Sequence, residues 1–254
     1  RISRCINNIN FSKNLEKKLF NYIFPKKTTS EATSELINFR EKIEIKKIIF
    51  RYMENQNEIT FQKNFTIKKG SFNCVVGKSG SGKTTLLDLL SGLLLPIKSD
   101  MIIDGKKIIN KPIKLKNKIS FVHQNFFLFN DSIKNNICFL EKDKVIDENK
   151  LKKVINISEL SDVVSKLPDG VNSVIGESGS KLSGGEKQRV SIARALYLDA
   201  EIIFMDESTN ALDKDTEMKI LQNLKKEYSG KKTFIMVLHN IVDKSLFDEI
   251  IDLS

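Results

Sequence analysis

The feature that most constrains this chain is a glycine-rich octapeptide between an apolar run and an amphipathic segment. The apolar run is Phe72–Val76, and the octapeptide is Gly77-Lys78-Ser79-Gly80-Ser81-Gly82-Lys83-Thr84, which fits the pattern G-x-x-x-x-G-K-[ST]. Glycines allow a tight loop whose backbone N–H groups point inward and form a cradle for an anion. A helix that begins near Lys83 adds the positive end of its dipole. The pattern therefore predicts a phosphate-binding loop between a strand and a helix.

The side chains of this loop suit a phosphate chain with its magnesium ion. Lys83 can reach the β and γ phosphates as a point charge, and the Thr84 hydroxyl can ligate Mg²⁺. The following segment has leucines on its core side, and Gly92 is a stop signal for the helix.

Two patterns of apolar residues predict an α/β fold. Phe72–Val76 and the runs at residues 202–205 and 234–238 are continuously apolar, which suits parallel strands covered by helices on both faces. Shorter runs between residues 43 and 109 have polar interruptions, and Asp104-Gly105 between two of them predicts a tight hairpin. We therefore expect a P-loop NTPase core with a mostly parallel sheet and an N-terminal antiparallel β layer.

The second apolar run ends in two acidic residues, Asp206 and Glu207. Beside a phosphate loop, Asp206 can be the outer-shell partner of Mg²⁺, and Glu207 can orient or deprotonate the attacking water. An acid at the end of a strand is common by itself, so this prediction depends on the phosphate loop.

A third element reads Leu182-Ser183-Gly184-Gly185-Glu186-Lys187-Gln188-Arg189 and continues with a helical pattern. Ser183 suits the N-cap of this helix, and the N–H groups behind it are free to meet an anion. A merely capped helix would be the ordinary interpretation if this element stood alone.

Together the three elements resemble the nucleotide-binding domain of ATP-binding-cassette (ABC) proteins, over about residues 43–253. The order of the motifs agrees: phosphate loop, Gln124, the Ser183 element, Asp206-Glu207 and His239. The resemblance implies an ATP hydrolase of the ABC transporter type, with ATP and Mg²⁺ as cofactors.

The resemblance also assigns roles to single residues. Tyr52 matches the aromatic residue that stacks on adenine, Gln124 the glutamine that contacts Mg²⁺ and couples to transmembrane helices, and His239 the switch histidine that contacts the γ-phosphate. Ala211-Leu212-Asp213 matches the crossing loop, which passes through the dimer interface. Asn210 stands where the family often has Ser, which removes no group needed for chemistry. The expected catalytic residues are Glu207, His239, Lys83 and Gln124; the expected ATP-binding residues are Tyr52, Gly77, Lys78, Ser79, Gly80, Ser81, Gly82, Lys83, Thr84, Thr85, Gln124, Ser183, Gly184, Gly185, Asp206 and His239; the expected metal ligands are Thr84, Gln124 and Asp206.

Several features resemble the exporter branch of the family. Gly176-Glu177-Ser178-Gly179 resembles a short exporter motif that meets the cytoplasmic helices of the membrane domain. Gln124 and Leu182 are 58 positions apart. That holds a helical subdomain, at about 125–195, but not the coiled-coil arms of DNA-repair ATPases.

The N-terminal part differs in character from the rest. The chain begins with Arg1, and residues 1–47 hold 11 Lys and Arg against 5 Asp and Glu. We expect residues 1–40 to be a basic linker from a missing transmembrane domain, with a short amphipathic helix at residues 15–23. Residues 41–254 are then the ABC ATPase domain.

The expected mechanism follows from the resemblance. Two copies pair head to tail, with ATP between the phosphate loop of one copy and Ser183–Gly185 of the other. The expected partners are the transmembrane domain of the same transporter, expected in the same full-length chain, and a second copy of the ATPase domain. The expected location is the cytoplasmic face of a membrane, which we expect to be the cell inner membrane. Nothing in the sequence indicates the exported cargo.

Composition leaves two alternatives open. The net charge of +10 would suit a soluble ABC ATPase that acts on nucleic acid or ribosomes. The short insert and the Glu177 motif argue against this class, so we expect no nucleic-acid partner. An importer ATPase on a separate chain is the other alternative.

No apolar stretch reaches the length of about 18 residues that spans a membrane, so we expect this piece to be soluble by itself. The cysteines, Cys5, Cys74 and Cys138, form no CxxC pair, which argues against a zinc site or a disulfide framework.

Overall fold

The computed structural model describes residues 37–52, 57–109, 113, 115–139, 145–239 and 243–254. Leu36–Ser254 form one compact unit. The predicted helix at residues 15–23 and most of the predicted linker lie outside the described residues. Among the helices within these ranges, none combines the length and apolar character that crossing a membrane requires.

The predicted antiparallel layer is confirmed as a five-stranded sheet. Its path is β2-β1-β5-β6, and β3 pairs with β1. The positive φ angles of Asp104 (49°) and Gly105 (80°) confirm the tight turn between β5 and β6. What looked like separate runs from residue 43 onward is one long strand, β1. The strands are β1 (Lys42–Phe50), β2 (Ile59–Phe61), β3 (Phe65–Lys68), β5 (Lys98–Ile103) and β6 (Lys106–Ile109).

The second sheet is parallel, as predicted, and has the order β10-β4-β9-β8-β7. Its three central strands are the three continuous apolar runs, and every residue of β8 and β9 is buried. Two outer strands, β7 and β10, were not predicted. The strands are β4 (Phe72–Val76), β7 (Ile119–Val122), β8 (Ile202–Asp206), β9 (Thr233–Val237) and β10 (Glu249–Asp252).

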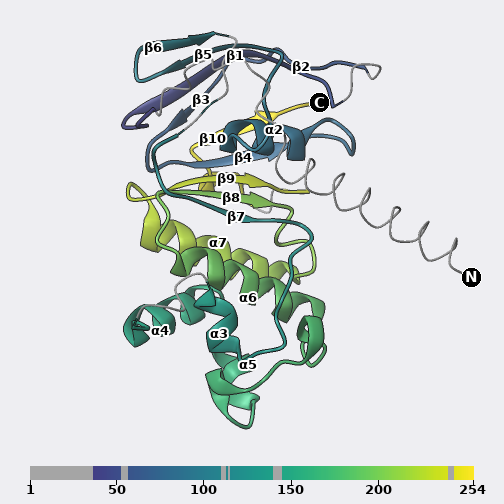
Figure 1. The fold of residues 1–254 in the computed structure, drawn as a ribbon, viewed down its shortest axis with the longest axis vertical. Helices are drawn as coiled ribbons and strands as arrows, with labels where there is room; N and C mark the ends of the chain where they lie inside the picture. The colour runs from purple at the N-terminus through teal and green to yellow at the C-terminus, as the bar shows by residue number, and fades with distance from the viewer. Residues whose placement is uncertain (1–36, 53–56, 110–112, 114, 140–144, 240–242) are drawn as a thin grey trace, which may run out of the picture. The chain divides into compact units, whose positions relative to one another are not determined.

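Helices cover both faces of the parallel sheet (Figure 1). Helix α2 packs between the two sheets, while α6 and α7 cover the opposite face and carry the smaller helices α3 to α5 beyond them. The helices are α2 (Lys83–Ser91), α3 (Ile133–Ile137), α4 (Glu148–Ile157), α5 (Ser161–Lys166), α6 (Gly184–Tyr197) and α7 (Lys214–Tyr228), with 3₁₀ turns η2 (Gly170–Asn172), η3 (Glu177–Gly179) and η4 (Lys244–Leu246).

The alternation of side chains along the parallel strands builds two cores. In β9, Phe234 and Met236 pack toward α6 and α7, whereas Ile235 and Val237 pack toward α2 and the antiparallel sheet. Because successive residues of a strand point to opposite faces, a continuously apolar strand serves both cores at once. The edge that carries the loops is therefore held rigidly from both sides.

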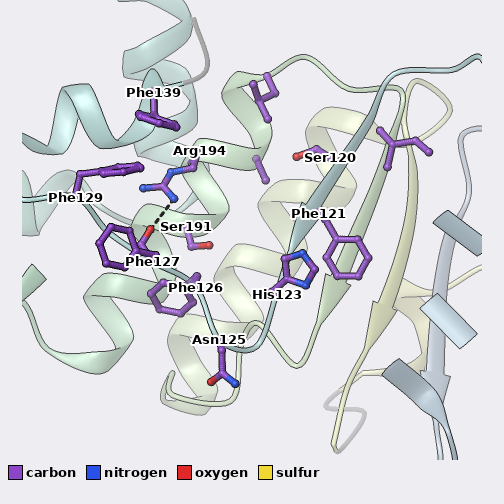
Figure 2. A pocket seen from close by; sticks show the side chains of 13 residues that line it. Ser120, Phe121, His123, Asn125, Phe126, Phe127, Phe129, Phe139, Ser191 and Arg194 are labelled. Carbon is purple, nitrogen blue, oxygen red and sulfur yellow. Dashed lines mark hydrogen bonds between the residues drawn. The ribbon is translucent and has the colours of Figure 1, made fainter. Parts of the chain in front are cut away.

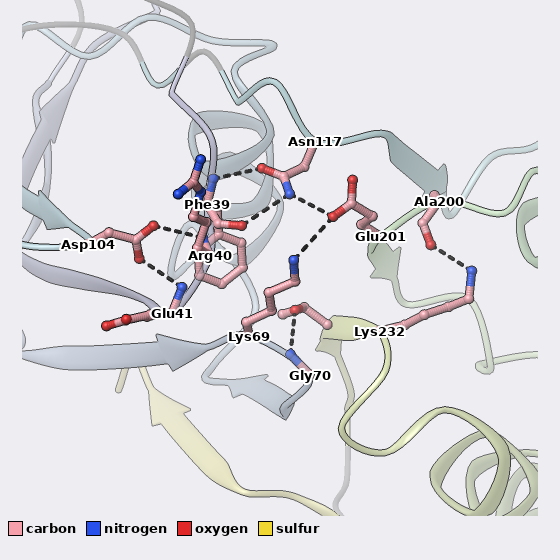
Figure 3. A network of polar contacts seen from close by, with 11 residues as sticks. Phe39, Arg40, Glu41, Lys69, Gly70, Asp104, Asn117, Ala200, Glu201 and Lys232 are labelled. Atoms are coloured by element: carbon pink, nitrogen blue, oxygen red, sulfur yellow. Dashed lines mark hydrogen bonds and ion pairs between the residues drawn. The ribbon is translucent and has the colours of Figure 1, made fainter.

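A polar network connects the residues just before β1 with the residues that precede strands β7 and β8 of the parallel sheet (Figure 3). The Asn117 side chain accepts a hydrogen bond from the Phe39 N–H (2.8 Å) and donates one to the Glu201 carboxylate (2.9 Å). Lys69, in the predicted turn after β3, also reaches Glu201, at 3.4 Å. Phe39 itself is 1% exposed, so residues just before β1 belong to the core.

Candidate active site

Four strand ends of the parallel sheet carry the predicted site residues. The phosphate loop follows β4, and His239 follows β9. Asp206 is the last residue of β8, with Glu207 directly after it, and Gln124 follows β7. Neighbours in the order β4-β9-β8-β7 are hydrogen-bonded, so these four ends lie in a row along one edge. This is the edge at which open parallel sheets bind their ligands.

The phosphate loop has the geometry of an anion cradle. Helix α2 begins after Gly82, which has no side chain to cap the first N–H groups, and the first turn of the helix contains no acid. Lys83 is 6% exposed, and its ammonium donates to the carbonyl oxygens of Gly77 (3.0 Å) and Lys78 (3.1 Å). A buried cation whose acceptors are loop carbonyls favours an anion placed inside the loop.

Gly82 is required twice at this position. Its φ of +89° lies in the left-handed region, and a Cβ atom would come within 3.0 Å of the Phe61 ring. Phe61 belongs to β2 of the antiparallel sheet, so that sheet supports the phosphate loop from behind.

A cavity of about 520 Å³ opens beside this loop. It brings together predicted residues from the loop, from the three other strand ends and from the antiparallel layer. Gly77, Lys78 and Ser81 belong to the same loop but do not line the cavity, and neither do Ser183, Gly184 and Gly185. The lining residues are Tyr52, Ile59, Ser79, Gly80, Gly82, Lys83, Thr84, Thr85, Gln124, Glu207 and His239.

Tyr52 stands at the rim of this cavity. Its ring is packed edge-on against Phe50, with centroids 4.8 Å apart, and its hydroxyl shares a hydrogen bond with Thr85 at 2.8 Å. The residue remains 54% exposed. A fixed aromatic ring with an open face suits a planar base.

Glu207 has a strained backbone. Its φ is +47°, in the left-handed region that non-glycine residues avoid, at a typical cost of about 1–2 kcal/mol. The turn directs its carboxylate into the cavity, where Oε2 accepts hydrogen bonds from Gln124 (3.0 Å) and Asn210 (2.8 Å). The other oxygen, Oε1, lies 3.8 Å from His239 Nε2. Strain of this kind is typical of functional positions.

Asp206 provides a test of whether the site suits a metal ion. The residue is 3% exposed, and its Oδ1 has no hydrogen-bond partner in the described structure. Burial raises the pKa of its carboxyl, while a hydrogen bond with Thr84 opposes the shift. An orphaned carboxylate oxygen beside a threonine hydroxyl fits Mg²⁺, which takes one or two carboxylates and prefers oxygen ligands.

The Ser183 element forms a second helix N-terminus, as predicted. The Ser183 hydroxyl accepts from the Glu186 N–H (3.3 Å), and the Glu186 carboxylate accepts from the Ser183 N–H (2.7 Å), a complete capping box. Ser183 and Gly184 are exposed to solvent. The single chain therefore presents this N-terminus outward and not into its own cavity.

Sequence reasoning missed several residues that shape the site. Ile59 lines the cavity and Phe61 limits the loop, yet both are ordinary apolar residues of a short strand. Asn210 and Gln188 bond to Glu207 and to the crossing loop, respectively. No local signal in the sequence marks these contacts, because each depends on how distant segments pack.

A second cavity, of about 400 Å³, lies between the parallel sheet and the helical part (Figure 2). Aromatic residues from the segment after Gln124 dominate its lining. Arg194 of α6 fixes this segment by donating to the carbonyl oxygens of Phe127 (2.8 Å) and Asn136 (2.7 Å). Phe127 is 60% exposed, which is unusual for so large an apolar side chain. The labelled lining residues are Ser120, Phe121, His123, Asn125, Phe126, Phe127, Phe129, Phe139, Ser191 and Arg194.

Comparisons with known proteins agree with this geometry. The ABC transporter family profile matches residues 61–210. An ATP-dependent lipid A-core flippase of Ralstonia nicotianae is 37% identical over 78% of this chain and 34% of its own length. The corresponding flippase of Wigglesworthia glossinidia brevipalpis is 35% identical over 92% of this chain and 40% of its own length.

Two further relatives come from another exporter group. The mitochondrial iron-sulfur clusters transporter ATM1 of Candida glabrata is 37% identical over 84% of this chain and 29% of its own length. A solved bacterial Atm1-family ABC exporter with ATP bound has a TM-score of 0.78 and 30% identity, over 94% of this chain and 42% of that one. The chain thus spans well under half of each relative. It belongs to the ABC transporter family and corresponds to the ATPase domain of its exporter-type members.

Proposed function

We propose that this chain binds and hydrolyses ATP as the motor domain of an ABC exporter, at the cytoplasmic face of a membrane. The observation that carries the proposal is the single cavity in which Lys83, Thr84, Gln124, Glu207 and His239 converge. Two copies would pair head to tail, so that ATP in the cavity of one copy meets the exposed Ser183 N-terminus of the other. Hydrolysis breaks the bond between the β- and γ-phosphates and leaves ADP and phosphate in place of the shared ATP. The pair is then loosened, a population shift driven by differential affinity.

The roles of the residues follow from their chemistry. Tyr52 would stack on adenine, and the loop N–H groups with Lys83 would hold the phosphates. Thr84, Gln124 and Asp206 would hold Mg²⁺, which when bound neutralises charge on the β and γ phosphates. Glu207 would orient the attacking water through Oε1, and His239, 58% exposed beside it, would contact the γ-phosphate.

The second cavity is the proposed docking site for the membrane domain. Its aromatic lining follows Gln124 directly, so a segment seated there would be close to a proposed Mg²⁺ ligand. The Glu177 motif packs beside the same segment: a Cβ on Gly179 would lie 3.0 Å from Leu128. An apolar helix from the transmembrane domain is the occupant that we propose.

Turnover by the purified 254-residue chain tests the ATPase assignment. Lys83→Ala and Glu207→Gln should each lower phosphate release at least about 100-fold, since each removes a preorganised charge at the reacting phosphate. Lys226→Ala, an exposed lysine on α7, is the matched control and should leave turnover unchanged. Undiminished phosphate release by either site variant would refute the assignment.

The docking proposal has its own test. Phe127→Asp places a charge in the second cavity without touching the first, so ATP binding by the chain should not change. In a protein that carries both this domain and its membrane-spanning half, the same variant should uncouple ATP hydrolysis from the membrane domain. Full transport by the variant would contradict this docking site.

A further inference from the structure

The Glu207 carboxylate is held by two amides that differ in origin. Gln124 Nε2, from the end of β7, and Asn210 Nδ2, three residues after Glu207 in the same turn, both donate to Oε2, at 3.0 and 2.8 Å. The Asn210 N–H also donates to the Glu207 carbonyl oxygen, at 3.3 Å. Asn210 thus contacts Glu207 through both its backbone and its side chain.

These bonds leave the two carboxylate oxygens unequal. Oε2 accepts two N–H groups, whereas Oε1 faces His239 and the cavity. A carboxylate acts as a water-orienting group only when its free oxygen points steadily at the water, and hydrogen bonds to the other oxygen provide that direction. Asn210 is therefore placed to set the orientation of Glu207.

The residue after Asn210 is tied to a different element. The Ala211 N–H donates to Gln188 Oε1 at 2.9 Å, and Gln188 lies on α6 with only 5% of its surface exposed. A Cβ on Gly185, also of α6, would come within 3.0 Å of the Ala211 carbonyl oxygen. The crossing loop is therefore fixed to the first turns of α6 by close packing and by a partly buried hydrogen bond.

We propose that Asn210 is a positioning residue for ATP hydrolysis, and that Gln188 positions Asn210 by fastening the crossing loop to α6. The inference rests on the proposed function, which makes Glu207 the group that orients water. Two hydrogen bonds then connect Glu207 to the helix whose N-terminus meets the nucleotide of the other copy. Neither residue touches ATP in this scheme, so both act on the rate of hydrolysis and not on nucleotide binding.

Two variants that remove the amide donor in different ways test Asn210. Asn210→Asp keeps the size of the side chain but replaces the amide donor with a second carboxylate, and Asn210→Ala removes the side chain. Each should lower kcat about 10-fold, the scale of losing one charge-assisted hydrogen bond that orients a reacting group, while KM for ATP stays within about twofold. Asn223→Ala is the matched control, because Asn223 donates to the Glu159 carboxylate at 2.7 Å on α7, away from the cavity; its kcat should not change.

Gln188 is tested by a pair of similar size. Gln188→Met removes the acceptor and should lower kcat about 3- to 10-fold, whereas Gln188→Glu retains an acceptor at the same reach and should recover most of that loss. Melting temperatures of both variants show whether either effect is a general loss of folding. A rate loss in Gln188→Met that Gln188→Glu does not restore would remove Gln188 from the scheme.

A double-mutant cycle tests whether the two residues act through one path. If they do, the double variant Gln188→Met/Asn210→Ala should have a kcat little lower than that of Asn210→Ala alone. In Gln188→Met/Asn223→Ala, the effects of the two substitutions on kcat should be independent. Independent losses for Gln188 and Asn210 would contradict the path.

Turnover of Glu207→Gln separates this inference from the proposed function. If Glu207→Gln eliminates hydrolysis while Asn210→Asp and Asn210→Ala keep the full kcat, the inference fails and the proposed function stands. If Glu207→Gln retains full hydrolysis, the proposed function fails, and the inference fails with it. A raised KM with unchanged kcat in the Asn210 variants would make Asn210 a nucleotide contact and overturn the positioning role.

Discussion

The two helix N-termini that we propose to meet the phosphates, at α2 and at α6, are built differently. Helix α2 begins at an uncapped Gly82 inside a cavity, with no acid in its first turn and the Lys83 ammonium beside it. Helix α6 begins at Ser183 on the surface, with a capping box that places the Glu186 carboxylate in its first turn. Under the proposed function, the first N-terminus supplies most of the groups that hold the phosphates, whereas the second supplies a smaller part.

Under the proposed function, this difference gives a physical reason for two copies to share one ATP. At α6 the capping box satisfies the Glu186 N–H and leaves the first N–H groups of the helix available. Those groups are too few, and too near an acid, to hold a triphosphate alone. They suit a γ-phosphate that another copy already holds.

The largest effect on turnover should come from adding a charge at the N-terminus of α6. Gly184→Asp adds this charge at a position where a Cβ would meet only the Ala211 Cβ, at an ordinary contact distance of 3.7 Å. We expect turnover to fall at least about 100-fold, since like charges across an interface cost several kcal/mol, while ATP binding to the single chain stays unchanged. Fluorescent-nucleotide binding and phosphate release measure the two quantities, with Gly184→Ala as the uncharged control. Reduced nucleotide binding by the monomeric variant would place Gly184 in its own chain's site and end the comparison.

A smaller effect, on stability, should come from changing the backbone of the loop at the N-terminus of α2. Gly82→Ala places a Cβ at φ +89° and 3.0 Å from Phe61, whereas Gly80→Ala meets the same kind of φ (+79°) with no atom within 4 Å. We expect Gly80→Ala to cost about 1–2 kcal/mol of stability from its backbone alone, and Gly82→Ala to cost more. Thermal unfolding measures both, at about 2–4 °C for each kcal/mol in a unit of this size. Equal melting temperatures would show that Phe61 does not constrain the loop.

The smallest effect should come from removing the acid at α6. Glu186→Gln keeps an acceptor for the Ser183 N–H but removes the charge that opposes an incoming phosphate. In a Glu207→Gln background, the ATP concentration for half-maximal pairing should fall roughly 2- to 5-fold. Glu148→Gln, which removes an acid from the first turn of α4, is the control. Weaker pairing of the Glu186 variant would mean that the carboxylate itself contributes to the interface.

Sequence reasoning was most successful where structure is set locally. The phosphate loop, the αL stop at Gly92 and the Ser183 cap each depend on a few adjacent residues, and all are present. The three central strands could be predicted because burial on both faces requires continuous apolar runs.

The unpredicted parts depend on distant partners. Strand β7 is only four residues long, and among the described strands it pairs with β8 alone, some 80 positions later; β10 pairs with β4. Ser120 in β7 and the acids in β10 give no clear strand pattern. The contacts of Asn210 and Gln188 arise only once α6 packs against the crossing loop, so composition and spacing could not reveal them.

Light scattering on the Glu207→Gln chain tests the central claim most directly. With saturating ATP and Mg²⁺ the particle should have twice the mass of the 29.0 kDa chain, and without nucleotide it should have the mass of one chain. Adding Gly184→Asp to the same chain should abolish the doubling without releasing the nucleotide. A particle with the mass of a single chain and with ATP bound would contradict the claim that two copies share each ATP.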